Sequence, residues 1–240
     1  MYDFSNLKMS DIIRCGIDIR ALGQGAQSME EAANELTKYF FNNFDDDQTK
    51  EKSCALVRFF KTHDIDKLPE NLQSFANNLL QEKPDRSSFK CLTLLATSGT
   101  EDSWQRREKS KGHQAIPLPS EEVVNRIPMM RNLVKQMGLD VKSVINPDPE
   151  LITDLSKKTF NVFHVPDAEG SLYIPAQEHF VKPYGIKSVL GFGGILPSGN
   201  VFIIIMFTRV PVSVDAANLF NTLTLNVKML ILSFENSVFS

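Results

Sequence analysis

The sequence of 240 residues has little of what marks several classes of protein. Its three cysteines form no close-spaced pair, which argues against a disulfide framework and favours a cytoplasmic location. A net charge of −3 provides no basic field for nucleic-acid phosphates. No apolar run reaches the ~18 residues that a membrane span requires, and residues 1–11 have no signal-peptide core. We therefore expect neither nucleic-acid binding nor a membrane span.

The familiar catalytic motifs are absent as well. The chain has no nucleophile elbow, no phosphate-binding loop and no zinc-protease motif. The glycines at 191, 193 and 194 lie within a predicted strand, where they indicate a bulge or a close backbone approach rather than a nucleotide loop. Because no nucleophile and base are readable, we predict that this chain is not an enzyme, with an enzyme of unknown type as an alternative.

The first half of the chain alternates helices and strands. Apolar spacing predicts helix over residues 10–44, with a break near Gly23 and Gly25 and a restart at Ser28. Short runs rich in Val, Leu and Phe predict strands over 53–62 and 89–97, with a helix over 69–81 between them. Residues 101–119 contain alternating prolines and are expected to form an extended loop.

The second half contains the strongest hairpin signal. A helix is predicted from Ser120 to Gly138 and a short strand over 161–165. Two β-rich runs, 186–196 and 201–210, flank the turn Pro197-Ser198-Gly199-Asn200. A helix over 215–234 follows.

These elements predict an α+β fold. We expect a central, largely antiparallel sheet flanked by N- and C-terminal helices, with a long loop insert. With no repeat and no flexible linker, residues 1–240 are expected to form one domain: N-terminal helices (1–44), a sheet core with inserts (53–210) and a C-terminal helix (214–235).

A small-molecule pocket is expected between the sheet and the loop 101–119. Long irregular segments in compact domains are usually functional, and this one contains the single tryptophan of the chain. Arg58 lies within a predicted strand, where an inward-facing guanidinium needs a carboxylate or phosphate acceptor; otherwise it faces solvent or pairs with a structural acid. The candidate ligand-binding residues are Arg58, His63, Trp104, His113, Gln114 and His164.

A redox, haem or metal site is the alternative. No histidines are spaced i, i+4 and no Cys-x-x-Cys is present, so the sequence requires no cofactor. Alternate residues of neighbouring strands would have to supply the ligands. The candidates are Cys54, His63, Cys91 and His164.

Several segments together resemble the GAF-like N-terminal sensory region of bacterial sensor histidine kinases and related signalling proteins. They are CALVRFFKTH (54–63), CLTLLATSG (91–99), GHQAIPLPSEEVV (112–124), NVFHV (161–165), YIPAQ (173–177) and YGIKSVLGFGGILPSGNVF (184–202). The resemblance implies a non-enzymatic sensory domain that binds a small ligand or partner. It also implies a signal relayed through the C-terminal helix to a kinase output module, which the sequence after residue 234 does not contain.

The last predicted helix is apolar on more than one side, and such a helix should be buried on more than one side. Leu225, Met229 and Leu232 lie opposite its main apolar face. We therefore expect a homodimer through the terminal helices, with Ile12, Ile13 and Ile17 from the first helix.

Overall fold

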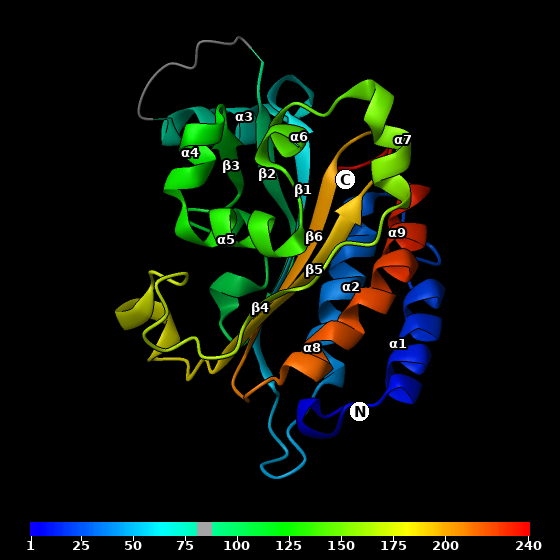
Figure 1. Cartoon of the computed structure of the whole chain (residues 1–240), viewed down its shortest axis with the longest axis vertical. Coiled ribbons are helices and arrows are strands. Elements are labelled where there is room, and N and C mark those ends of the chain that lie inside the picture. Colours follow the sequence, from blue (N-terminus) through cyan, green and yellow to red (C-terminus); the bar gives the residue numbers. More distant parts are fainter. Residues whose placement is uncertain (81–87) are drawn as a thin grey trace.

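A six-stranded antiparallel sheet forms the centre of the protein (Figure 1), in a computed structural model that describes residues 1–80 and 88–240. The strand order is β3-β2-β1-β6-β5-β4. The strands are β1 (Cys54–Asp64), β2 (Lys90–Gly99), β3 (Ala115–Leu118), β4 (Phe163–Val165), β5 (Ser188–Ile195) and β6 (Val201–Thr208). β1 and β6 lie at the centre, where both faces are covered, and this explains their almost continuous apolar sequences.

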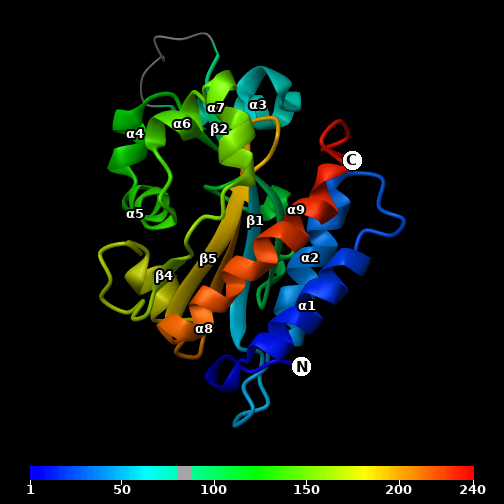
Figure 2. The same cartoon turned by 45° about the vertical axis from the view of Figure 1, so that its right-hand side comes forward.

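One face of the sheet, the helix face, is covered by helices from both ends of the chain (Figure 2). These are α1 (Met9–Ala21), α2 (Met29–Asn43), α8 (Val214–Leu219) and α9 (Thr224–Leu232), with a short 3₁₀ turn, η6 (Phe220–Leu223), between the last two. α2 begins where expected, because Ser28 Oγ accepts a hydrogen bond of 3.1 Å from the Glu31 amide. Phe40, Phe192, Phe202 and Phe220 are fully buried within this layer.

The opposite face, the loop face, is covered by short helices and irregular segments. They include α4 (Glu121–Arg126), α5 (Pro128–Met137), α6 (Val141–Ile145), α7 (Pro149–Lys157) and a π-helical turn, η5 (Gln177–Val181). α3 (Glu70–Leu79) lies beside β3. Leu94, Leu133, Phe163 and Phe207 belong to the apolar core of this layer.

The α+β fold with a central antiparallel sheet is as predicted, and so is the hairpin of β5 and β6, whose turn places Gly199 at a φ of +79°. The helix predicted over 69–81 corresponds to α3, and Gln81 lies outside the described residues.

Three predictions of local structure are wrong. The loop 101–119 contains an edge strand, β3, which accommodates Pro117 because an edge strand can lack one ladder donor. Pro128 ends α4 and begins α5, where a single helix was expected. The helix over 215–234 is interrupted by η6.

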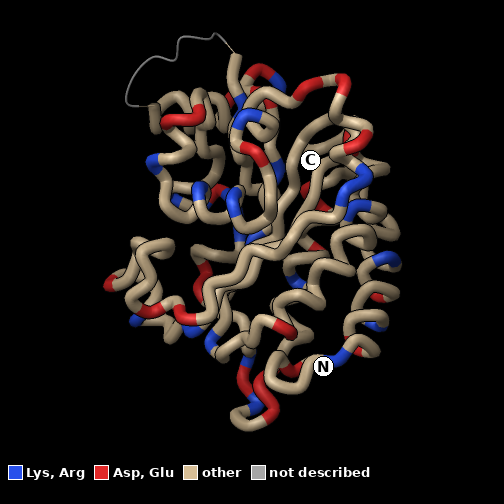
Figure 3. Tube along the Cα trace, viewed as in Figure 1, with Lys and Arg blue, Asp and Glu red and all other residues tan. Residues whose placement is uncertain are grey.

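Acidic and basic residues are interspersed along much of the described trace, while the central strands β5 and β6 carry none (Figure 3). Within the described part of the chain, no helix has the length and apolar character needed to cross a bilayer.

Candidate functional site

Arg58 lies near the middle of β1 and faces the loop side of the sheet. In the ladder it stands directly opposite Thr97 of β2 and Ile205 of β6. Directly opposite residues point to the same face, and Ile205 belongs to the apolar core of the loop face. β1 therefore places a guanidinium within a mostly apolar layer.

The Arg58 guanidinium has no acidic partner among the described residues. Its Nε is buried and has no hydrogen-bond partner there. Burial alone lowers the pKa of Arg58 to about 10, and at that value the side chain is still charged at neutral pH. Arg58 as a whole is half-buried. A half-buried cation without an acceptor still costs free energy, so this residue is badly placed for stability and well placed for an anion.

An aromatic group lies next to Arg58 on the loop face. Trp104 packs against Tyr184 and Phe180, with ring centroids 4.4 and 5.5 Å away, and Phe180 lies 5.0 Å from Phe207. Phe207 pairs with Leu56, two residues before Arg58, so the backbone positions of Leu56 and Arg58 are about 7 Å apart along the strand. We call Trp104, Phe180, Tyr184 and Phe207 the aromatic wall.

Two glutamines hold the segments that carry this wall. Gln177 Nε2 donates to the carbonyls of Ala168 (3.0 Å) and Ile174 (2.7 Å), which fixes the turn before Phe180. Gln114 Nε2 donates to the carbonyls of Glu108 (3.1 Å) and Ser110 (3.0 Å) in the loop after Trp104. Gln114, a predicted ligand residue, is thus engaged in holding its own loop.

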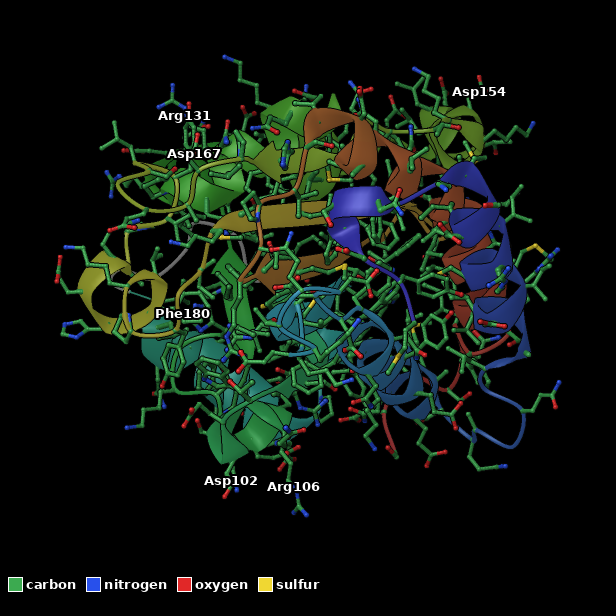
Figure 4. The ribbon with its side chains drawn as sticks, turned by 90° about the horizontal axis from the view of Figure 1, so that it is seen from below. Asp102, Arg106, Arg131, Asp154, Asp167 and Phe180 are labelled. Atoms are coloured by element: carbon green, nitrogen blue, oxygen red, sulfur yellow. The ribbon has the colours of Figure 1, made fainter. Side chains whose placement is uncertain are left out.

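The rim of this region differs from its interior. Figure 4 shows Asp102 and Arg106 pointing away from the molecule, while Phe180 points back toward its body. Trp104 lies close against the sheet, since a Cβ on Gly99 would come within 2.9 Å of its ring. Gly99 is therefore needed for the tryptophan to reach this position.

His113 is an exposed residue near Arg58. Although the residue has contact with solvent, the protein atoms around its ring, and after them the positive charge of Arg58, lower the pKa of His113 to about 4. The imidazole is therefore neutral at physiological pH and adds a donor or acceptor without adding a second positive charge. Arg58, Trp104 and His113 are the predicted site residues that the structure brings to one region.

The other two predicted histidines lie elsewhere. His63 projects from β1 onto the helix face, where its Nε2 is 3.1 Å from Lys61 Nζ. His164 is on the edge strand β4, and its backbone amide donates to Gln136 Oε1 at 2.7 Å. Neither shares the surroundings of Arg58.

The four candidate metal ligands do not converge. His63 and Cys91 are direct neighbours across β1 and β2, but Cys54 lies at the other end of β1 and His164 at the far edge of the sheet. Residues 1–80 and 88–240 contain no cluster of three or more potential metal ligands. Burial raises the pKa of Cys54 and Cys91 to about 12, far from the low values of metal-binding or reactive thiols.

A cavity of about 300 Å³ lies at the start of β2 rather than beside Trp104. Its polar wall contains Lys90, whose Nζ is 2.8 Å from Asp64 and 2.9 Å from Asn200 Oδ1. The end of the predicted pocket loop reaches this cavity through Leu118 and Pro119. Because Lys90 is already paired, the cavity lacks the free charge that distinguishes Arg58.

No profile of a known protein family matches this chain, and no curated protein matches it. A search of solved structures finds several similar folds. The structure of free methionine-R-sulfoxide reductase from Neisseria meningitidis, solved with its substrate, has a TM-score of 0.53 and 9% identity, covering 97% of this chain and 95% of that chain. At this identity the likeness shows a shared fold alone.

Two GAF domains of cyanobacterial phytochromes are also similar. One is bound to phycoerythrobilin (TM-score 0.43, 9% identity, 95% of this chain and 96% of that chain). The other is bound to phycocyanobilin (TM-score 0.42, 11% identity, 96% and 97%). GAF domains are thus among the solved structures that this chain resembles.

The comparison with the reductase corrects one prediction. We predicted that this chain is not an enzyme. That prediction is wrong, because a protein of similar fold is a reductase and the fold therefore does not exclude an enzyme. The absence of a familiar motif was a poor guide, since many chemistries recur on one fold without a shared sequence signature.

Sequence reasoning missed Phe180 and Tyr184 of the aromatic wall. They belong to residues 166–187, to most of which no element was assigned because the stretch has neither helical nor strand periodicity. The spacing of two aromatic residues four apart was the available signal, since side chains at i and i+4 share one side of a helical turn.

Proposed function

We propose that this chain is a GAF-like sensory domain that binds a small organic anion at Arg58. The observation that carries the proposal is the Arg58 guanidinium, which has a buried Nε without a partner and no acid nearby among the described residues. Unpaired charges of this kind are concentrated at binding and catalytic sites, where a ligand can supply the missing acceptor.

The surroundings of Arg58 define the class of ligand. A carboxylate or phosphate would accept hydrogen bonds from the guanidinium. The aromatic wall, whose Phe207 lies opposite a residue two positions from Arg58 along β1, would contact an apolar or planar body attached to that anion. A compact aromatic carboxylate meets both requirements.

We further propose a cytoplasmic protein that acts as a homodimer and relays its signal through α9 to a histidine-kinase-type output module. Support for the dimer comes from two neighbouring helices with exposed apolar stripes. Met9, Ile13 and Ile17 of α1 are 47–59% exposed, and Leu225, Met229 and Leu232 of α9 are 41–64% exposed.

A second copy of this chain fits these stripes. α1 and α9 approach so closely that a Cβ on Gly16 would come within 2.8 Å of the Asn226 side chain, so the two stripes form one surface. Two such surfaces would pack as a four-helix arrangement that buries apolar area on both copies. Ile12, which we expected in this interface, is 2% exposed and packs inside the protomer instead.

A thermal-shift comparison of matched ligands tests the anion site. We expect millimolar benzoate to raise the melting temperature of the protein, because a ligand that binds only the folded state stabilises it. Uncharged benzamide, with nearly the same shape, should have little effect. Inorganic phosphate and acetate would show whether the charge alone is sufficient.

The Arg58→Met variant should lose the benzoate shift measured against its own unliganded melt. Arg106→Met, which removes an exposed arginine of the neighbouring loop, is the matched control and should keep it. An equal shift with benzamide, a shift that persists in Arg58→Met, or no shift with any of the anions would contradict the proposal.

A further inference from the structure

A second group of basic side chains lies toward the other end of β1, on the helix face. Lys61 and His63 are two residues apart and therefore point to the same side, with Nζ and Nε2 separated by 3.1 Å. Lys61 is 3% exposed and His63 is 5% exposed. Within residues 1–80 and 88–240, no carboxylate forms a salt bridge with Lys61.

This pair accommodates one positive charge and is poorly suited to two. The Lys61 ammonium only donates, so His63 Nε2 accepts and the ring proton is on Nδ1, which is buried and has no partner among the described residues. Burial, and then the positive charge of Lys61, hold the pKa of His63 well below its usual 6.5. Burial also lowers the pKa of Lys61 to about 8.

The segment that follows α9, residues 233–239, covers this pair, and we call it the closing segment. The ring centroids of Phe239 and His63 are 5.4 Å apart. The Arg107 guanidinium also lies over the Phe239 ring, 5.6 Å from its centroid. The closing segment thus places an aromatic ring directly against the imidazole.

Two backbone hydrogen bonds attach the closing segment to the start of α2. The amides of Met29 and Glu30 donate to the carbonyls of Ser237 and Val238, both at 2.9 Å. The first amides of a helix have no partner within the helix, so the closing segment supplies partners that α2 otherwise lacks. Figure 2 shows the end of this segment beside the upper end of α2.

We propose that the closing segment is a proton-operated latch: a second proton on the Lys61–His63 pair displaces Phe239 and releases residues 233–239 from α2. Since the segment follows α9 directly, release would free the end of that helix. The latch is independent of the proposed ligand at Arg58.

The charged groups around the pair do not balance a second proton. Asp64 is 2.8 Å from Lys90 and 3.1 Å from Lys67, and Glu30 is 2.7 Å from Arg107, so these acids are already paired. Glu235 of the closing segment raises the pKa of Lys61 but is engaged with Ser198 Oγ at 2.5 Å. The charges that act on the pair are those of Asp64, Lys67, Lys90 and Glu235, and Arg107, paired with Glu30, lies over the covering ring of Phe239.

Amide hydrogen exchange of Met29 and Glu30, measured by NMR, tests the latch directly, because these two amides lose their acceptors when it opens. After correction for intrinsic exchange, we expect their protection to fall on the order of tenfold per pH unit below about 6.5. The amide of Ile204, at the centre of the sheet, exchanges by global unfolding, and it should remain more strongly protected than the two amides at every pH.

His63→Gln preserves an acceptor for Lys61 and removes the titration, so protection of the two amides should become independent of pH. His179→Gln, which replaces an exposed histidine of η5, is the matched control and should behave as the parent. Protection that is constant in the parent, or that falls equally in His63→Gln, would overturn the latch.

Phe239→Ala provides a second reading should His63→Gln fail to fold. This variant keeps His63 but removes the covering ring, so Met29 and Glu30 should be weakly protected at every pH. Undiminished protection in Phe239→Ala would also overturn the latch.

Discussion

Single residues determine how closely the central strands approach each other. Gly193 on β5 is the clearest example, because a Cβ there would lie 2.0 Å from the carbonyl oxygen of Phe202 on β6. A Cβ on Gly191 would come within 3.2 Å of the Phe163 ring. The predicted close backbone approach is therefore found at Gly193, whereas Gly191 makes room for a side chain.

Gly193→Ala should therefore destabilise the protein. Relieving the overlap requires a backbone shift at the centre of the sheet, and such overpacking costs about 2 kcal/mol of the free energy of unfolding. Gly112→Ala is the control, because nothing lies within 4 Å of its Cβ position, and it should be nearly neutral. Urea unfolding curves that show equal stability for both variants would contradict the packing at β5 and β6.

At the scale of elements, the β5–β6 hairpin forms the centre of the sheet with β1. Ile204 of β6 is fully buried between the strands and the helix face. Its neighbour across the ladder, Phe192, is 1% exposed. A charge at this position would have no acceptor and no water.

Ile204→Asp is expected to cost several kcal/mol of the free energy of unfolding, about 4 kcal/mol. Val214→Asp, at a residue that is 59% exposed, should leave the melting temperature almost unchanged. Melting of Ile204→Asp close to that of the parent would show that the strand is not buried as described.

The terminal helices provide the second prediction at this scale. Changing Ile17 and Met229 to glutamate places two charges in the exposed apolar surface of α1 and α9 and should convert the dimer to a monomer. Leu172→Glu, at a residue that is 87% exposed on the other side of the sheet, should leave the dimer intact. Light scattering would decide, and a parent protein that is monomeric at micromolar concentration would rule the interface out.

At the scale of the whole molecule, three histidines make the stability depend on pH. Burial is the first cause that lowers the pKa of His63, His113 and His164 in the folded protein. The unfolded chain takes up these protons near pH 6.5, whereas the folded protein does so only at lower pH. Unfolding therefore binds protons as the pH falls below 6.5, and stability is lost in that direction.

The free energy of unfolding should be nearly constant between pH 7 and pH 8 for these groups and fall below pH 6.5. The fully buried His63 alone contributes a slope of about 1.4 kcal/mol per pH unit there. Urea unfolding at a series of pH values measures it. The slope should be smaller in His63→Gln, and a flat profile down to pH 5 would contradict the burial of these rings.

The sequence predicted the architecture well wherever a local signal was strong. Ser28 marked the start of α2, and the turn with Gly199 marked the hairpin, because caps and turns depend on neighbouring residues only. β3 was missed because a four-residue edge strand with a proline has no periodicity of its own. Its existence depends on pairing with β2, a contact that the sequence does not display.

The candidate site was predictable only in part. Arg58 and Trp104 were recognised from their residue types, and the structure adds that Arg58 has no acid beside it among the described residues. The separation of His63 and His164 from them follows from which face each strand residue occupies. The face to which a strand residue points, and the place of its strand in the sheet, depend on pairing between segments far apart in the sequence. Residue type alone could therefore not show which of these side chains lie together.

The central claim is that Arg58 serves a ligand rather than the stability of the fold. The stability of Arg58→Met without any ligand tests this claim most directly. Methionine removes the half-buried, unpartnered charge and fills similar space, so we predict that urea unfolding shows a gain of about 1 kcal/mol over the parent. A loss of similar or greater size would show that Arg58 stabilises the fold, and would contradict the account.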